Sequence, residues 1–315
     1  MSEAQQDRKD TTTTGAVARP KPIKAVPLRH WGRRICAAVL LYLAVALLYS
    51  LAKNPHVDWT TIGEYLFKGL TLRGLVVTIY LTVIAMTIGF FGGTLLAVMR
   101  LSDNYVLSTI AYAYIWFFRG TPVLVQILIW GFLGALYPQL FLGIPFTNLM
   151  FASAETSAVI GATTAAILAL GLNEAAYAAE IIRAGIISVD KGQTEAALSL
   201  GMSSGSTMLR VVLPQSMRVV IPPLGNETIG MLKTTALVSV ISGNDLLTNL
   251  QIAYGQNFKI IPLLLVATIW YLVLTTILSI GQHYVERHFG KGFATDEGSR
   301  AERRGMRREA RRDEV

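Results

Sequence analysis

Two uncharged apolar runs constrain this chain more than any other feature of its sequence. Residues Ile35 to Ala52 form a run of 18, and Gly74 to Met99 form a run of 26. A helix needs about 20 apolar residues to cross roughly 30 Å of hydrocarbon. We therefore expect both runs to be transmembrane helices.

Four further segments bring the expected number of spans to about six. The apolar segment Val106 to Leu142 is interrupted by Arg119-Gly120-Thr121-Pro122, which predicts an interfacial or entering segment, a break, and a spanning helix from about Pro122 onward. The other spans are expected at Ser157 to Ile186, at Ile221 to Leu247 with a start weakened by Pro222-Pro223, and at Ile261 to Gln282. The predicted fold is an all-α polytopic membrane protein.

The distribution of charge decides between a membrane and a nucleic-acid partner. The net charge is +8, but only 15% of residues are charged, well below the roughly 25% of soluble domains. Of the 28 Lys and Arg residues, 8 lie in residues 1–34 and 9 in residues 286–315. The basic residues are thus concentrated in the two tails, so we expect contact with membrane lipid and none with nucleic acid. The one cysteine, Cys36, leaves no intramolecular disulfide.

The Lys and Arg residues also predict how the chain is oriented in the membrane. With six spans, 22 of the 28 Lys and Arg residues fall on the side of the two tails. The positive-inside rule then places both termini in the cytoplasm and makes residues 184–220 the large cytoplasmic loop. The small residues Ser50 and Ala52 resemble a signal-peptide cleavage site, but a long polar leader followed by later spans favours an uncleaved anchor.

The segments outside the spans carry fewer signals. Residues 1–34 are expected to be a disordered cytoplasmic leader, because they lack apolar content. In the external segment 53–68, Trp59, Ile62 and Leu66 share a helical face with Leu70, after a potential N-cap at Asp58. Residues 286–315 form a charged cytoplasmic tail. Its basic cluster, Arg303 to Arg312, either contacts anionic lipid or only sets the topology.

Several kinds of chemistry are absent from the sequence. No G-x-x-x-x-G-K-[ST] loop occurs, so the chain is not itself an ATPase of that class. The four histidines show no H-E-x-x-H pairing, so we expect no metal site and no metalloprotease. Gly89 and Gly93 form a G-x-x-x-G pair, which permits two helices to approach closely and carries no functional weight here.

The large cytoplasmic loop is the most informative segment. Residues Gly192 to Pro214 read GQTEAALSLGMSSGSTMLRVVLP. The pattern predicts a short helix, a turn at Gly201 with φ > 0, and a second helix that Ser203 or Ser204 caps and Pro214 stops. Two short helices joined at a glycine form a compact projection on which a soluble partner can dock.

The spacing within this loop resembles a known family. Glu195-Ala196-Ala197, three residues, Gly201, nine residues, Val211, one residue and Leu213-Pro214 are similar to the EAA loop of permease subunits of binding-protein-dependent ABC importers, with Val for the usual Ile. The segments FFRGTPVLVQ, AAYAAEIIRAGI and LPQSMRVVIPPLGNE resemble the subfamily that takes up polar amino acids such as histidine, arginine, glutamine, glutamate and opines.

The resemblance implies an architecture, a location and a set of partners. Residues 69–285 would form the five-span importer domain, and residues 35–52 an additional N-terminal helix. The chain would lie in a bacterial inner membrane, would not be an enzyme and would need no cofactor of its own. Its partners would be separate ABC ATPase subunits that bind ATP, a second permease copy or a paralogue, an extracytoplasmic solute-binding protein and the amino acid. The residues of the loop that dock on the ATPase would be Glu195, Ala196, Ala197, Gly201, Leu213 and Pro214.

Ionisable and polar groups at membrane depth are the candidate pathway residues, because lipid exposure of such groups is costly. Glu174 lies nine residues before Arg183, or about 13 Å along a helix, and has no opposite charge at i+3 or i+4. Its partner could be Lys233, Arg119, water or a solute. The candidate substrate or pathway residues are Glu174, Arg119, Thr121 and Lys233.

Two of these features have a structural alternative. Glu180 and Arg183 are three residues apart, which favours a structural ion pair over a role in transport. Thr121 and Pro122 either break the helix so that backbone groups meet a solute, or kink it for packing.

A secondary transporter driven by an ion gradient would explain the charges in the membrane, but it leaves the EAA spacing unexplained. A membrane-embedded enzyme would need a catalytic constellation that the sequence lacks.

Overall fold

The computed structural model describes residues 31–55, 57–144 and 150–289, which divide into two units at the boundary between Val57 and Asp58. The first unit contains helix α1, Trp31–Lys53. The helix starts earlier than expected, because residues 31–34 are helical and not part of a disordered leader. A tryptophan at the end of an apolar helix is typical of the membrane interface. The rest of the expected leader, and all but the first few residues of the expected charged tail with its basic cluster, lie outside the described residues.

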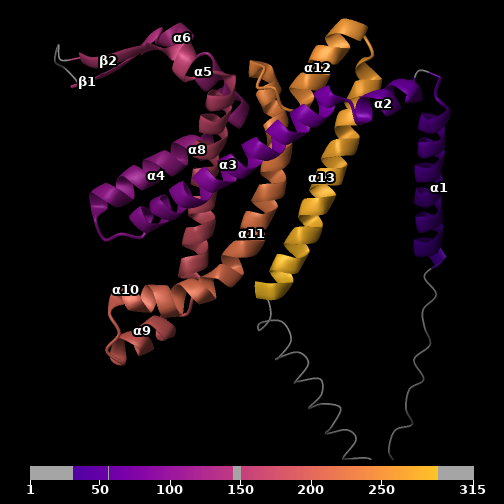
Figure 1. Ribbon diagram of the computed structural model, residues 1–315. Coiled ribbons are helices and arrows are strands. Elements are labelled where there is room, and N and C mark those ends of the chain that lie inside the picture. Colours follow the sequence, from indigo (N-terminus) through magenta and orange to yellow (C-terminus); the bar gives the residue numbers. More distant parts are fainter. Residues whose placement is uncertain (1–30, 56, 145–149, 290–315) are drawn as a thin grey trace, which may run out of the picture. The chain divides into compact units, whose positions relative to one another are not determined.

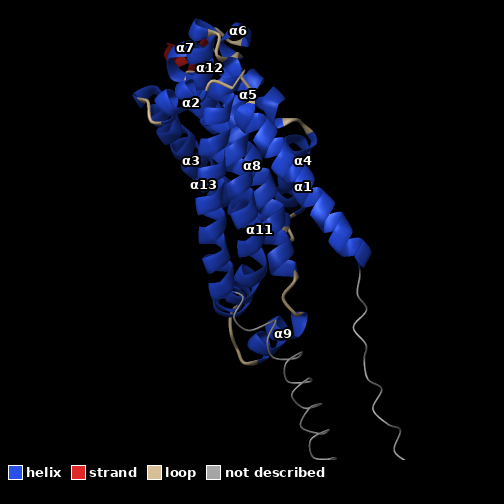
Figure 2. Cartoon of the chain, turned by 90° about the vertical axis from the view of Figure 1, so that its right-hand side faces the viewer, coloured by secondary structure: helices blue, strands red, loops and turns tan. Residues whose placement is uncertain are grey.

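The second unit is a bundle of helices with one small hairpin. Its elements, in chain order, are α2 (Trp59–Leu66), α3 (Gly69–Arg100), α4 (Tyr105–Gly120), α5 (Val123–Gly131), α6 (Leu133–Leu136), β1 (Gln139–Gly143), β2 (Met150–Glu155), α7 (Thr156–Val159), α8 (Ala162–Ile187), α9 (Lys191–Ser199), α10 (Ser204–Thr207), a π-helical segment (Met208–Val212), α11 (Leu213–Thr234), a 3₁₀ segment (Thr235–Ile241), α12 (Leu246–Asn257) and α13 (Ile260–Phe289). Helices α9 and α10 lie at one end of this bundle, and α6 with the hairpin lies at the other (Figures 1 and 2).

The antiparallel hairpin β1–β2 is the one departure from an all-helical fold among the described residues. Otherwise the predicted fold class is confirmed. By length and composition, α1, α3, α8 and α13 can each cross a membrane. The pair α4 and α5 would make a fifth span, although the two helices are bent by 97°. The expected count of six spans stays a prediction.

Two predicted spans are wrong in their boundaries. The helix expected from Pro122 to Leu142 ends at Gly131, and residues from Gln139 onward form a strand. The helix expected from Ile221 to Leu247 begins at Leu213 and ends at Thr234, where the 3₁₀ segment follows. Pro222 and Pro223 lie inside this helix and do not weaken its start. Membrane helices tolerate such prolines because neighbouring side chains satisfy nearby backbone groups, and Gln282 of α13 donates to the Pro222 carbonyl at 3.3 Å.

The core of the bundle is the contact between α3 and α8. The buried face of α8 is rich in alanine, which lets α3 approach closely. A Cβ placed on Gly93 of α3 would lie 2.6 Å from the Ala178 Cβ and 2.9 Å from the Ala179 backbone nitrogen. A Cβ on Gly89 would lie 2.2 Å from the Glu174 Cγ. The G-x-x-x-G pair of the sequence therefore forms the closest part of this helix contact.

Gly93→Ala should lower the stability of the assembled protein by about 1–3 kcal/mol, the usual cost of adding a methyl group to a packed core. The backbone of α8 stands in the way, so the helices must separate. Thermal unfolding measured in detergent checks this. The control is Gly255→Ala on α12, where an added Cβ meets no atom within 4 Å. An unchanged melting temperature for Gly93→Ala would contradict the close packing.

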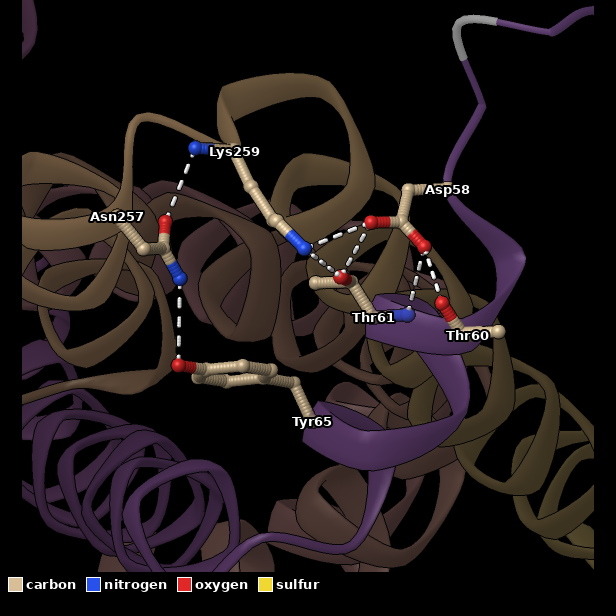
Figure 3. Close-up of polar contacts among 6 residues, drawn as sticks. All are labelled: Asp58, Thr60, Thr61, Tyr65, Asn257 and Lys259. Carbon is tan, nitrogen blue, oxygen red and sulfur yellow. Dashed lines mark hydrogen bonds and ion pairs between the residues drawn. The ribbon is translucent and has the colours of Figure 1, made fainter.

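A polar cluster fastens α2 to the start of α13. Asp58 caps α2 as predicted, because its Oδ1 accepts from the Thr61 amide at 3.0 Å. Its Oδ2 lies 2.7 Å from Lys259 Nζ, which also donates to Thr61 Oγ1 (Figure 3). Asn257 Nδ2 donates to the Tyr65 hydroxyl at 3.2 Å. The bond from Lys259 holds the pKa of Asp58 well below its usual range, and Asp58 in turn raises the pKa of Lys259.

Lys259→Gln should lower the melting temperature slightly, since both partners are solvent-accessible and exposed pairs contribute little. The contribution of Asp58 is fully present above its ordinary pKa of 3.8 and is lost as the pH falls, because folding lowers that pKa. The contribution of Lys259 is fully present below its ordinary pKa of 10.5 and is lost as the pH rises. The difference between wild type and variant should therefore be flat from about pH 5 to about pH 9 and should shrink in high salt. A difference that varied within this pH window would assign the effect to another group.

Candidate functional site

The segment Lys191–Val212, which we call the coupling segment after the role expected from its sequence, has the two short helices and the turn that the sequence predicts. Asp190 caps α9 by accepting from the Gly192 amide at 2.7 Å, and Ser203 caps α10 by accepting from the Ser206 amide at 3.3 Å. Between these helices Gly201 adopts φ = 82°, as expected. The Met202 amide donates to the Ala197 carbonyl at 3.2 Å and the Gly201 amide to the Leu198 carbonyl at 2.9 Å, which together form a Schellman motif.

The exposed residues of this segment are those that a partner could contact. Glu195 and Ala196 are exposed on α9, whereas Ala197 is buried against the rest of the segment. Leu200 is 84% exposed and Leu209 is 67% exposed. These two leucines are apolar surface that a protein partner could cover.

The second helix of the segment does not stop at Pro214, which corrects the sequence prediction. Helix α10 continues through the π-helical segment Met208–Val212 into α11. Pro214 lies just after the π-helical segment and inside this continuous helical run, where a proline usually kinks the helix. A π-helical turn is a common site of bending within a helix, and Figure 1 shows α10 and α11 running in different directions. Displacement of α10 would thus be transmitted directly to α11.

The break between α4 and α5 is the second feature of the site. Thr121 has an extended backbone, with φ = −112° and ψ = 141°, because the residue before a proline disfavours the helical region. Gln126 Nε2 donates to the carbonyls of Phe118 at 3.0 Å and Thr121 at 3.2 Å. Asn173 Nδ2 of α8 donates to the same Phe118 carbonyl at 3.0 Å and to Gln126 Oε1 at 3.2 Å.

These two buried amides satisfy the carbonyls that the break leaves without helical partners. The Thr121 hydroxyl is also engaged, since it donates to the Phe117 carbonyl at 2.9 Å and accepts from Gln126. The geometry favours a break that serves helix packing over a break that exposes backbone groups to a solute. A direct contact between Thr121 and substrate stays a prediction.

The sequence did not single out Gln126 or Asn173, although Gln126 ends the flagged segment FFRGTPVLVQ and Asn173 directly precedes Glu174. Gln126 is the one amide side chain in the apolar helix α5, and Asn173 precedes Glu174 in an alanine-rich run. A lone amide in an apolar membrane helix indicates a buried hydrogen bond. This signal was available in the sequence, but the partner of each amide was not.

Glu174 is buried in the α3–α8 contact and is only 2% exposed. Its Oε1 has no hydrogen-bond partner among the described residues. Glu227 of α11, a carboxylate that the sequence did not single out, acts electrostatically on Glu174. Lys233, one of the partners that the sequence offers for Glu174, is exposed. Together with Tyr271 of α13, it lines a hollow. No ion pair joins Lys233 to Glu174 in the part of the chain that the structure describes.

The predicted ion pair between Glu180 and Arg183 is present, with Arg183 Nη2 2.8 Å from Glu180 Oε2. Arg119 lies at the end of α4 with its guanidinium 5.2 Å from the centre of the Tyr177 ring. It also acts electrostatically on Glu180 and Glu227. The structure therefore brings Arg119 and Glu180 of α8 to one cavity, whereas Lys233 lines a different hollow.

Comparison with known proteins identifies the architecture. Residues 85–291 match the family described as the binding-protein-dependent transport system inner membrane component. The chain belongs to this family. It is therefore a membrane-embedded permease subunit and not an enzyme. The matched region includes α8, the coupling segment and α11, which hold most of the residues described above.

Relatives cover most of the chain. The arginine transport system permease protein ArgU of Corynebacterium glutamicum is 46% identical over 88% of this chain and 86% of its own length. The glutamate/aspartate import permease protein GltK of Escherichia coli is 35% identical over 73% of this chain and 97% of its own. A crystal structure of an amino acid ABC transporter with histidines superposes with a TM-score of 0.61 and 37% identity, covering 74% of this chain and 99% of that one.

Proposed function

We propose that this permease imports amino acids with energy from separate ATPase subunits, and that the coupling segment is the point of attachment. The observation that carries the proposal is the continuity of α10, the π-helical segment and α11. A partner that holds Glu195, Ala196 and the neighbouring exposed side chains would move α10, and α11 would follow as part of the same helix. ATP would bind to the partner, and this chain would need no cofactor.

Transport then follows from motion of α11 relative to α8. The two helices are in contact, and a Cβ on Gly185 of α8 would lie 2.2 Å from Val220 Cγ2 of α11. Glu227 lies on α11, whereas Glu174 lies on α8. A shift of α11 therefore changes the distance between the two carboxylates. In this mechanism the pathway opens alternately to the two sides of the membrane, as rigid helices move around a fixed site.

Basic amino acids are the proposed cargo. A relative with 46% identity is an arginine transport permease, and Glu174 and Glu227 are carboxylates on α8 and α11, two helices in contact. A guanidinium or ammonium group would neutralise them, and charged groups within a membrane usually mark a substrate pathway. Arg119, Lys233 and Thr121 are secondary candidates for contact with the cargo.

The complete transporter would contain a second permease copy or a paralogue, two ATPase subunits and an extracytoplasmic solute-binding protein. Co-expression of the chain with the ATPase from the same source tests the proposal. The two should copurify, and proteoliposomes that contain both should import arginine only with ATP and the binding protein. Arginine uptake by the purified chain alone, driven by an ion gradient, would instead establish the secondary transporter.

The proposed orientation in the bacterial inner membrane places both termini and the coupling segment in the cytoplasm. A reporter enzyme fused after Val315 should therefore be active in the cytoplasm, and one inserted near Asn54 should be active outside. The reason is that 22 of the 28 basic residues lie on the proposed inner side. An external C-terminus would mean that the number of spans is odd.

A further inference from the structure

A cavity of about 520 Å³ opens between the ends of α3 and α8 and one face of α4. We call it the arginine pocket, because Arg100, Arg119 and Arg183 line it together with one carboxylate, Glu180. Arg183 is paired with Glu180, so the charges of Arg100 and Arg119 remain in excess among the lining residues. Nothing in the proposed transport cycle requires two such charges on one side of α4.

Aromatic rings hold these two arginines and leave their donors accessible. The Arg100 guanidinium lies 5.1 Å from the centre of the Tyr112 ring, and that of Arg119 lies 5.2 Å from the Tyr177 ring. Arg100 also donates to Ser108 Oγ at 3.1 Å. A guanidinium has five N–H donors in one plane, so a ring face and one hydrogen bond leave most donors free for an anion.

The position of the pocket indicates what kind of anion it meets. Arg100 is the last residue of the long helix α3, and Arg183 lies within the last turns of α8, just before the coupling segment. Tyr112 and Trp116, which also line the pocket, are 55% and 68% exposed. Tyrosine and tryptophan are enriched at the depth of lipid head groups, and basic pockets between membrane helices bind anionic head groups.

We propose that the arginine pocket binds the phosphate of an anionic phospholipid in the leaflet that faces the coupling segment. The phosphate would accept hydrogen bonds from Arg100 and Arg119, because phosphate oxygens match the planar donors of arginine. The glycerol and acyl chains would lie along Trp116 and Tyr112. Bound there, the lipid would link α4 to the ends of α3 and α8.

Native mass spectrometry of the complete transporter, purified in detergent, tests this proposal. Dioctanoyl phosphatidylglycerol should bind with saturation, and the affinity should fall about five-fold in Arg100→Gln and in Arg119→Gln, since each basic residue near a lipid surface contributes about 1 kcal/mol. Arg100→Lys and Arg119→Lys, which keep the charge, should lose less. Arg73→Gln, at the other end of α3, is the matched control and should bind like wild type.

Three further ligands separate the possible sources of the anion. Dioctanoyl phosphatidylcholine should bind at least about five-fold more weakly than phosphatidylglycerol by the same argument, and inorganic phosphate and free arginine should not displace the lipid at millimolar concentration. Equal binding of phosphatidylglycerol by wild type and the double glutamine variant would overturn the proposal. Displacement by free arginine would also overturn it and would assign the pocket to the cargo. Should the double variant not assemble, Arg100→Gln alone decides, because that side chain has one hydrogen bond to lose.

Discussion

Gly201→Val should reduce ATP-driven uptake to background while the amount of the chain in the membrane stays near that of wild type. Gly201 adopts φ = 82°, which a β-branched residue does not tolerate. The glycine is exposed, and an added Cβ would meet no atom within 4 Å. The substitution therefore strains the turn between α9 and α10 without disturbing the helix bundle, so the loss should fall on attachment of the ATPase.

The conformational argument has its own control. Asparagine adopts positive φ more readily than other residues that carry a Cβ, so Gly201→Asn should keep most of the uptake. Glu195→Lys should weaken copurification of the ATPase by reversing an exposed charge on α9. Uptake assays, quantitative immunoblots of membranes and copurification measure the three quantities. If Gly201→Val lost protein and uptake in equal proportion, the turn would belong to the folding of the chain and not to docking.

The coupling segment was predictable because its signals are local. Capping residues, a glycine at a required positive φ and the fixed EAA spacing each act within a few residues, so the sequence predicts both helices and the turn. The end of the second helix was predicted wrongly because Pro214 has two meanings. Proline often stops a helix, but inside a helix that continues it can instead produce a kink. Only the continuation into α11 decides between the two, and that continuation depends on the packing of α11 against α8 and α13.

The intramembrane part of the site was less predictable because its contacts are distant in sequence. The sequence places Glu174 correctly within a membrane helix, but nothing in it indicates that Gly89 of α3 lies against that side chain. The same holds for Asn173, which reaches a carbonyl at the break between α4 and α5 across 55 residues of chain. Hydropathy also cannot show that the segment after Pro122 turns by 97°, since the helices on both sides of the break are apolar.

Glu174→Gln should lower the uptake of arginine and lysine about ten-fold relative to that of neutral amino acids. A hydrogen bond to a charged group contributes about 1.5–3 kcal/mol, and each 1.4 kcal/mol is a factor of ten. The substitution keeps the volume of the side chain, which matters because Glu174 packs against Gly89. It removes the charge and replaces one acceptor oxygen with an NH2 donor. Copurification of the ATPase should be unchanged, since Glu174 lies far along α8 from the coupling segment.

Access to Glu174 is the step that this variant tests most directly. The carboxylate is 2% exposed, and its Oε1 lacks a partner among the described residues. A buried carboxylate oxygen without a partner is costly, so a state in which α11 has moved and a cation reaches Glu174 would relieve that cost. Glu227→Gln should show the same selectivity, because Glu227 lies on the moving helix and acts on Glu174. Glu155→Gln, which alters an exposed carboxylate on β2, should leave the ratio of basic to neutral uptake unchanged. If Glu174→Gln also left that ratio unchanged, Glu174 would serve only the packing of α3 against α8. Other residues would then select the cargo.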